Sequence, residues 1–203
     1  MLGIVRPTRG LEFAESAHSI EKNVDCACVM ERSWDKPLPD AFNDLVFTLL
    51  GNPEIKYIWI VEEDVVVPQG ALLEMWKENA DIVAINYKLK HGGSSFRRSA
   101  FGELLWVSLG CTLIKRQVFE KVTYPWFKTG YTIASIREGN TEERYALVPA
   151  VQDYAGHDAY FCWNAKQAGM SLALVEGMEA GHLVLDRLGY KDTNQGCHVI
   201  RRV

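Results

Sequence analysis

The stretch from residue 57 to residue 68 constrains the fold more than any other part of the chain. An apolar run is followed by three acids and by a second apolar run that ends at Pro68. Runs rich in β-branched and aromatic residues favour a strand buried on both faces, as in a parallel sheet covered by helices. Unpaired charges are too costly to bury in such a core. We therefore expect the acids at the carboxyl end of the strand, where open α/β sheets bind ligands. These acids are Glu62, Glu63 and Asp64.

The three acids favour a cation site. Carboxylates held close together repel one another, and a divalent cation that takes oxygen ligands, such as Mn²⁺ or Mg²⁺, relieves this repulsion. A simpler interpretation stays open. In it, Glu62 and Glu63 are solvated turn charges and only Asp64 matters, as a helix cap.

Strands and helices alternate along the first half of the chain. This alternation predicts the α/β class, with a mainly parallel mixed sheet flanked by helices. The expected strands cover residues 3–5, 23–31, 57–61 and 81–87, and the expected helices cover residues 12–22, 40–50 and 71–76.

The pattern is less regular beyond residue 87. A strand-like stretch over 103–115 is broken at Gly110, and a helix that starts near Gly156 is closed by Gly169. A last short strand follows at 171–175. Residues 129–152 combine few apolar side chains with mixed charge, so we expect a loop or lid there.

Length and composition favour one soluble globular domain. The 203 residues suffice for a sizeable core, and 48% apolar and 24% charged residues are ordinary values. The net charge of −4 gives no basic surface for nucleic acid. The chain shows no signal-peptide pattern and no apolar run long enough to span a membrane, so we expect a cytoplasmic protein. The five cysteines, at positions 26, 28, 111, 162 and 197, are expected to be thiols in a reducing compartment.

Polar residues follow two further strands of the predicted sheet. The loop after the first strand offers two guanidinium groups and a hydroxyl, which suit an anionic ligand, although solvent-facing arginines are an equally good interpretation. Its residues are Arg6, Pro7, Thr8 and Arg9, and Glu31 is expected to end the second strand at the same edge.

Three more candidates lie later in the chain. Asp158 falls in the first turn of a predicted helix, next to His157, where it is either an ordinary cap or a base held ionised. A predicted exposed aromatic cluster contains Trp126 and Phe127, and His182 follows the last strand. For the aromatic pair, packing beneath the lid is at least as good an interpretation.

The order of these parts resembles the GT-A fold of nucleotide-sugar-dependent glycosyltransferases, particularly the family-2-like group. In that family a strand ends in Asp-x-Asp, an aspartate starts a later helix, and a histidine follows roughly two dozen residues on. The matching stretches here are Tyr57 to Pro68, Gly156-His157-Asp158 and Gly181-His182. The chain departs from the family in two places, because Glu62 stands for an aspartate and His157 for a glutamate.

The resemblance implies a metal-dependent transfer of a sugar from a nucleotide-diphosphate sugar to an acceptor hydroxyl. It implies Mn²⁺ or Mg²⁺ held by Asp64 and His182 with Glu62, and Asp158 as the base of an inverting reaction. It further implies acceptor contacts from Trp126, Phe127 and His157. The donor would contact Arg6, Pro7, Thr8, Arg9, Glu31, Glu62 and Glu63.

The same resemblance implies a single catalytic domain over residues 1–203. Residues 1–87 would form a nucleotide-binding half, residues 88–185 an acceptor half, and residues 186–203 a tail. Two other functions stay open: a nucleotidyltransferase that makes nucleotide-sugars, and a non-catalytic binding module with the same fold.

Overall fold

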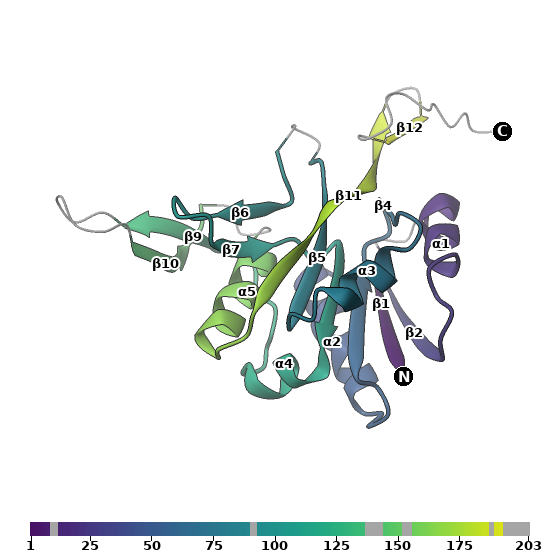
Figure 1. Ribbon diagram of the computed structural model, residues 1–203, viewed down its shortest axis with the longest axis horizontal. Helices are drawn as coiled ribbons and strands as arrows, with labels where there is room; N and C mark the ends of the chain where they lie inside the picture. The colour runs from purple at the N-terminus through teal and green to yellow at the C-terminus, as the bar shows by residue number, and fades with distance from the viewer. Residues whose placement is uncertain (9–11, 90–92, 137–143, 152–155, 187–188, 193–203) are drawn as a thin grey trace.

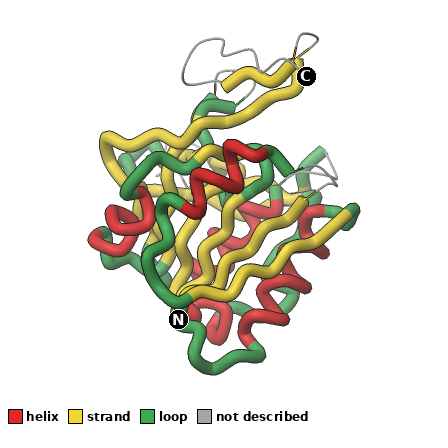
Figure 2. Tube along the Cα trace, turned by 90° about the vertical axis from the view of Figure 1, so that its right-hand side faces the viewer, coloured by secondary structure: helices red, strands yellow, loops and turns green. Residues whose placement is uncertain are grey.

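The computed structural model describes residues 1–8, 12–89, 93–136, 144–151, 156–186 and 189–192. A twisted sheet lies between two layers of helices (Figures 1 and 2). In chain order the elements are β1 (Leu2–Thr8), α1 (Ala14–Glu21), β2 (Cys28–Trp34), α2 (Leu38–Leu50), β3 (Tyr57–Val61), β4 (Val65–Val66), α3 (Ala71–Lys77), β5 (Ile82–Tyr87), β6 (Phe96–Arg98), β7 (Leu104–Val107), β8 (Cys111–Lys115), α4 (Arg116–Lys121), β9 (Tyr131–Ile136), β10 (Arg144–Pro149), α5 (His157–Gln167), β11 (Leu172–Asp186) and β12 (Gly189–Asp192).

The main sheet is mixed. Its strand order is β12-β11-β5-β8-β3-β1-β2, and β4 pairs with β11. β1 runs parallel to β2 and β3, and β5 runs parallel to β11. β8 is antiparallel to both of its neighbours, β3 and β5, and β12 is antiparallel to β11. The predicted α/β class is therefore confirmed. Along this order β1, β2, β3, β5 and β11 run in one direction and β8 and β12 in the other, so the sheet is mixed with a parallel majority of strands, as predicted.

β3 is buried on both faces, as its sequence predicts. Ile58 and Ile60 pack into a core with α2, α4 and α5, whereas Trp59 and Val61 pack into a second core with α1 and α3. Because side chains alternate along a strand, a strand covered on both sides needs an unbroken apolar run. The acids begin at the first position beyond this strand.

The helix expected over 12–22 is α1. Its buried side chains are Ser16, Ser19 and Ile20, so its inner face is partly polar. The Ser16 hydroxyl donates to the Val65 carbonyl over 2.6 Å, and the Ser19 hydroxyl accepts from the Val67 backbone N–H over 2.9 Å. α1 therefore holds the segment after β3 through hydrogen bonds as well as through apolar packing.

The expected loop over 129–152 contains a β-hairpin, in which β9 and β10 are antiparallel. The hairpin projects from the main body at the left of Figure 1. Its inner face packs against α5 and β7 and buries Ile133 completely. A hairpin packed on one face alone needs few apolar residues, which explains why the low apolar density suggested a loop.

Two strands have other bounds than predicted. β2 runs from Cys28 to Trp34 rather than ending at Glu31, and the strand expected at 171–175 continues to Asp186 as β11. β2 lies at the edge of the sheet and carries exposed residues, so its sequence lacks a clean apolar pattern. A break in register between Leu174 and Glu179 interrupts the pairing of β11 with β5.

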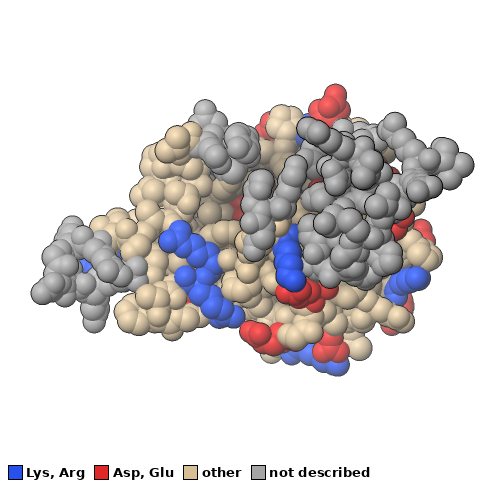
Figure 3. Space-filling view, turned by 90° about the horizontal axis from the view of Figure 1, so that it is seen from above, with Lys and Arg blue, Asp and Glu red and all other residues tan. Residues whose placement is uncertain are grey.

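In the view of Figure 3, one group of Lys and Arg side chains lies left of centre, and acidic side chains lie mainly toward the lower and right edges. Cys26, Cys28, Cys111 and Cys162 are free thiols, and Cys197 lies outside the described residues. None of the helices in the described part of the chain is long and apolar enough to cross a membrane.

Candidate functional site

Three distant segments of the chain meet at the carboxyl end of β3. They are the acidic segment after β3, the first turn of α5, and the part of β11 that contains His182. Glu62 lies close enough to Asp64, Asp158, His157 and His182 for all four to act on its charge. The structure thus brings together residues that are up to 120 positions apart, the separation between Glu62 and His182.

Pairing of β4 with β11 places His182 beside Asp64. His182 faces Val65 in the antiparallel register, and the Leu183 backbone N–H donates to the Asp64 carbonyl over 2.7 Å. His182 Nε2 lies 3.5 Å from Asp64 Oδ2, and His182 Nδ1 lies 3.1 Å from the Lys88 carbonyl oxygen. Because a carbonyl only accepts, Nδ1 carries the proton and directs Nε2 at the carboxylate.

Burial and the neighbouring carboxylate act in opposite directions on His182. Burial lowers the pKa of the imidazole, but the contact with Asp64 outweighs burial and raises that pKa above its usual value. The imidazole is thus biased toward the charged form that pairs with Asp64.

His157 and Asp158 form a second imidazole–carboxylate pair. His157 Nε2 lies 2.9 Å from Asp158 Oδ1, and the ring of His157 packs on that of Phe42 at a centroid distance of 5.3 Å. Only 8% of His157 is exposed. Burial opposes its charge, but Asp158 and then Glu62 raise the pKa of His157 overall. His157 therefore contacts Asp158 from the protein interior, and its predicted contact with an acceptor is replaced by this pairing.

Glu62 is the most strongly perturbed carboxyl group of the site. Burial, followed by the charges of Asp64 and Asp158, raises the pKa of Glu62 to about 8. Glu62 is half-buried, and the neighbouring carboxylates disfavour its ionised form.

Tyr87 forms the back of the site and was missed in the sequence. Its ring lies 5.1 Å from that of His182, and its hydroxyl hydrogen-bonds Ser108 Oγ at 2.5 Å. A Cβ at Gly110 would lie 2.4 Å from the Tyr87 hydroxyl oxygen, so a larger residue there would displace the tyrosine. Gly110, which breaks the strand-like stretch over 103–115, was the feature of the sequence that could have indicated a bulky neighbour at this position.

Three residues of β1 that were predicted to bind a nucleoside, and Glu63 after β3, have buried side chains. Arg6 is fully buried, and its guanidinium donates to Ser16 Oγ over 3.0 Å and to Glu12 Oε1 over 2.9 Å. The Thr8 hydroxyl donates to the Ser33 carbonyl over 2.7 Å. Pro7 is buried, and Glu63 is only 5% exposed. We assign these four residues a structural role beneath the site.

Of the two other donor-site candidates, one lies away from the end of its strand and the other cannot be placed. Glu31 lies in the middle of β2, opposite Val5 of β1, rather than at the strand's end. Arg9 lies outside the described residues.

The predicted exposure of Trp126 and Phe127 is wrong. Trp126 is 6% exposed and Phe127 1% exposed, within the core formed with α2, α4 and α5. The Trp126 indole N–H lies 3.0 Å from the Phe119 carbonyl oxygen. Tyr124 is the exposed member of the cluster. The packing interpretation is therefore correct, and neither buried ring is free to contact an acceptor.

A cavity of about 550 Å³ opens beside Asp158. Its walls come from β7, the β9–β10 hairpin and the start of α5. It is lined by Trp106, Tyr131, Thr132, Pro149, Ala150, Val151, Gly156, Asp158 and Ala159. Of these lining residues, only Asp158 was a candidate from the sequence. The others come together through the β9–β10 hairpin, which the sequence did not predict.

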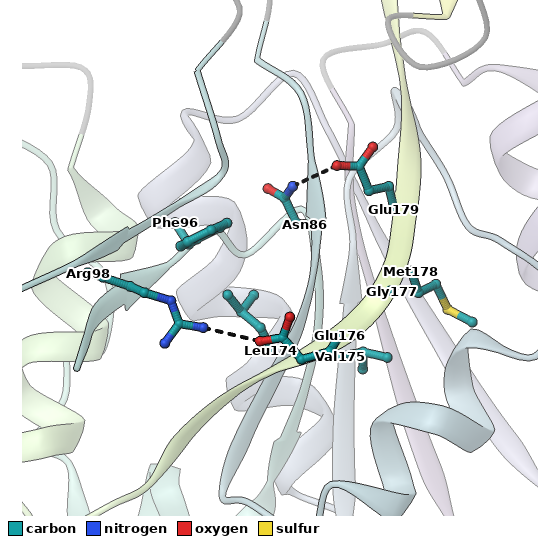
Figure 4. A pocket seen from close by; sticks show the side chains of 9 residues that line it. All are labelled: Asn86, Phe96, Arg98, Leu174, Val175, Glu176, Gly177, Met178 and Glu179. Atoms are coloured by element: carbon teal, nitrogen blue, oxygen red, sulfur yellow. Dashed lines mark hydrogen bonds and ion pairs between the residues drawn. The ribbon is translucent and has the colours of Figure 1, made fainter. Parts of the chain in front are cut away.

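A second cavity, of about 690 Å³, lies between β5, β6 and β11 (Figure 4). Its polar side chains are paired across it. Arg98 donates to Glu176 over 3.3 Å, and Asn86 donates to Glu179 over 3.2 Å. This cavity contains none of the residues predicted from the sequence.

Asp64 and His182 are the residues of the site that could contribute to a cation site. Within the described ranges, no group of three or more His, Cys, Asp or Glu side chains is placed to hold a metal ion. Asp64 and His182 nevertheless supply an oxygen and a nitrogen next to the protonated Glu62. Mg²⁺ is commonly held by one or two carboxylates with substrate phosphates as further ligands. Such a site does not require three preformed protein ligands.

Comparison with known proteins identifies a similar fold. No protein-family model matches the chain, and no curated protein matches it. Among solved structures, the crystal structure of A197 from STIV superposes with a TM-score of 0.64 at 20% sequence identity. The match covers 100% of this chain and 97% of A197. The similarity extends over the whole α/β fold.

Proposed function

We propose that this chain is a glycosyltransferase with a GT-A-like fold, which transfers a sugar from a nucleotide-diphosphate sugar to an acceptor hydroxyl. The observation that carries the proposal is the convergence of Glu62, Asp64, Asp158 and His182 at one edge of the sheet. Ligands of open α/β sheets bind at the carboxyl ends of their strands. The fold shared with A197 is consistent with this proposal.

Asp64 and His182 would hold Mn²⁺ or Mg²⁺ together with the diphosphate of the donor. When bound, the cation neutralises negative charge on the diphosphate oxygens as a Lewis acid. Glu62 is a further ligand candidate, because a nearby cation favours the ionised form of a carboxyl group. The Nδ1–H contact of His182 with Lys88 fixes the imidazole so that Nε2 faces the cation position.

Asp158 is the proposed general base. Its carboxylate lies in the first turn of α5, where the helix dipole stabilises negative charge, and it lines the cavity that would receive the acceptor. The acceptor oxygen bonds to the anomeric carbon while its proton passes to Asp158. The bond from the anomeric carbon to the diphosphate oxygen breaks, and its electron pair leaves with the nucleoside diphosphate. This single displacement inverts the anomeric configuration.

A thermal-stability series tests the donor site. The native chain and Asp64→Ala are melted with UDP, GDP, ADP or CDP, each with and without Mn²⁺. A ligand at about 100 times its Kd stabilises the folded state by roughly 2.7 kcal/mol. We expect one nucleotide to raise Tm in the presence of Mn²⁺, and this increase to disappear in Asp64→Ala.

Asp44→Ala is the matched control, because this exposed carboxylate on α2 pairs only with Lys36 among the described residues. It should keep the nucleotide effect. A folded native chain whose Tm changes with none of the four nucleotides would overturn the proposal. Nucleotide binding without any transfer or hydrolysis of a nucleotide-sugar would instead indicate a binding module.

A further inference from the structure

We infer that the acceptor is a flat, apolar alcohol of the phenol class, bound in the cavity beside Asp158 with its hydroxyl toward that carboxylate. This inference rests on the proposed function and names the substrate class of the same site. It is carried by the lining of the 550 Å³ cavity, in which Asp158 is the one charged side chain among the lining residues. The other walls are mainly aromatic, aliphatic or proline surface.

The described part of the lining has few groups to receive a polyhydroxylated sugar. Among its described residues, Tyr131 and Thr132 carry hydroxyls in addition to the Asp158 carboxylate. A sugar ring would bring several hydroxyls, and each one that loses water without gaining a partner costs free energy. A phenol brings a single hydroxyl, which Asp158 can accept. Its ring can pack against the half-buried side chains of Trp106 and Tyr131.

The second cavity has a different lining, and the comparison supports an apolar acceptor. The 690 Å³ cavity of Figure 4 contains guanidinium, amide and carboxylate groups on both sides, which is the lining that a polyol requires. Asp158 does not line that cavity. The proposed base therefore serves the apolar cavity, although the chain also has a polar one.

Proton transfer to Asp158 is also better matched to a phenol. A phenolic hydroxyl has a pKa of about 10, whereas water, as a guide to aliphatic hydroxyls, is near 15.7. The difference in pKa between the proton donor and a carboxylate base is therefore smaller for a phenol than for an aliphatic alcohol, which favours proton transfer from the phenol. In the reaction, the phenolic oxygen bonds to the anomeric carbon, its proton passes to Asp158, and the nucleoside diphosphate leaves with the electron pair of the broken bond.

Fluorine NMR on the unmodified chain tests the inference. The probes are 4-fluorophenol and 2-deoxy-2-fluoroglucose, each titrated with native protein while its fluorine line width is followed. We expect 4-fluorophenol to bind more tightly than the fluorosugar, and its Kd to rise by about tenfold in Trp106→Ala because a stacking surface is lost. Val151→Asp should also weaken binding, since it adds a charge to the apolar rim at a fully exposed residue.

Phe47→Ala is the control for non-specific binding to exposed rings. Phe47 is 69% exposed on α2 and pairs with Tyr124, away from the cavity, so its removal should leave the Kd of 4-fluorophenol unchanged. Tighter binding of the fluorosugar, or phenol binding that survives both Trp106→Ala and Val151→Asp, would overturn the inference.

The nucleotide series separates this inference from the proposed function. If a nucleoside diphosphate with Mn²⁺ raises Tm but 4-fluorophenol does not bind, the acceptor class is wrong and the donor site stands. If 4-fluorophenol binds through Trp106 but no nucleotide raises Tm, the acceptor role of the cavity is overturned together with the proposed function.

Discussion

Glu62 shows how a single residue couples the site to stability. The folded protein holds this carboxyl group next to Asp64 and Asp158, and its pKa rises from 4.5 to about 8. Between these two values the unfolded chain releases the proton that the folded chain keeps. The free energy of unfolding therefore falls as pH rises from about 4.5 to about 8, by at most about 1.4 kcal/mol per pH unit.

Glu62→Gln should consequently stabilise the protein at pH 8 by about 2 kcal/mol or more, and much less at pH 5, because glutamine carries no charge to bury. Urea unfolding of both proteins at pH 5, 6.5 and 8 measures the effect. Glu54→Gln, at an exposed position, should show no such trend. If the free energy of unfolding of Glu62→Gln differs from that of the native protein by the same amount at all three pH values, the raised pKa is contradicted.

Arg6 supports the site from below. Its buried guanidinium joins β1 to Glu12 and to Ser16, which in turn holds the segment after β3. Arg6→Ala should cost about 3 kcal/mol, because a buried ion pair loses one partner. Arg32→Ala removes the more exposed partner of the same Glu12 and should cost no more than about 1 kcal/mol. Equal losses in a denaturant titration would argue against the structural role of Arg6.

Residue chemistry and the resemblance each predicted part of the site. The acids after the buried strand lie at its carboxyl end, as their charge requires, whereas only the resemblance implied that Asp158 and His182 lie near them, as they do around Glu62. Arg6 and Thr8 have side chains that suit a ligand and a protein neighbour equally, and only their contacts decide between the two. Trp126 and Phe127 were misplaced for a similar reason, because aromatic residues in a proline-containing turn pack inward or outward according to tertiary contacts.

At the scale of elements, the start of α5 is fixed by its contact with the β9–β10 hairpin. Gly156 has φ +93°, and a Cβ there would lie 1.7 Å from the Tyr131 carbonyl oxygen. The helix can approach the hairpin this closely only with glycine. This contact places Asp158 next to the cavity that the hairpin lines.

Gly156→Ala should therefore destabilise the protein by at least about 3 kcal/mol, through backbone strain and a backbone clash together. Gly169 provides the control. It has φ +79° at the other end of α5, but a Cβ there meets nothing within 4 Å. Gly169→Ala should cost only about 1–2 kcal/mol. Thermal unfolding of the two variants separates the two effects, because Gly169→Ala introduces backbone strain alone and Gly156→Ala introduces strain and a clash. Equal losses of stability in the two variants would show that the contact with Tyr131 is not tight.

Elements were predictable where burial dictates the pattern. The strands β3 and β5 are covered on both faces, and the helix α2 is buried along one full stripe. Their apolar patterns are therefore clear. The β9–β10 hairpin and the edge strand β2 expose one side, and their patterns are mixed. Past the register break, β11 pairs with β5, β4 and then β12, and the contacts with β5 and β4 join segments that are distant in the sequence.

At the scale of the whole molecule, the two predicted halves share one sheet. β8, from the half after residue 87, lies between β3 and β5 of the first half and pairs with both. The antiparallel direction of β8 was not expected from an alternating strand–helix pattern. A division near residue 87 is therefore not a boundary between folding units.

A fragment of residues 1–87 should accordingly remain unfolded, because β3 and β5 lose the strand that joins them. The full chain should unfold in one transition, since one sheet runs through both halves. Circular dichroism and tryptophan fluorescence in urea give two probes for this, and their midpoints should coincide. A fragment that shows cooperative unfolding on its own would contradict this interpretation.

The β6–β7 hairpin separates the two cavities by the alternation of its side chains. Trp106 of β7 lines the apolar cavity, and its cross-strand neighbour Arg97 donates to the Ile133 carbonyl of β9 on the same side. Phe96 and Arg98 alternate with Arg97 and line the polar cavity. The two strands of one hairpin therefore line different cavities, so point mutations in β7 can diversify the apolar cavity during evolution while β6 keeps the lining of the polar one.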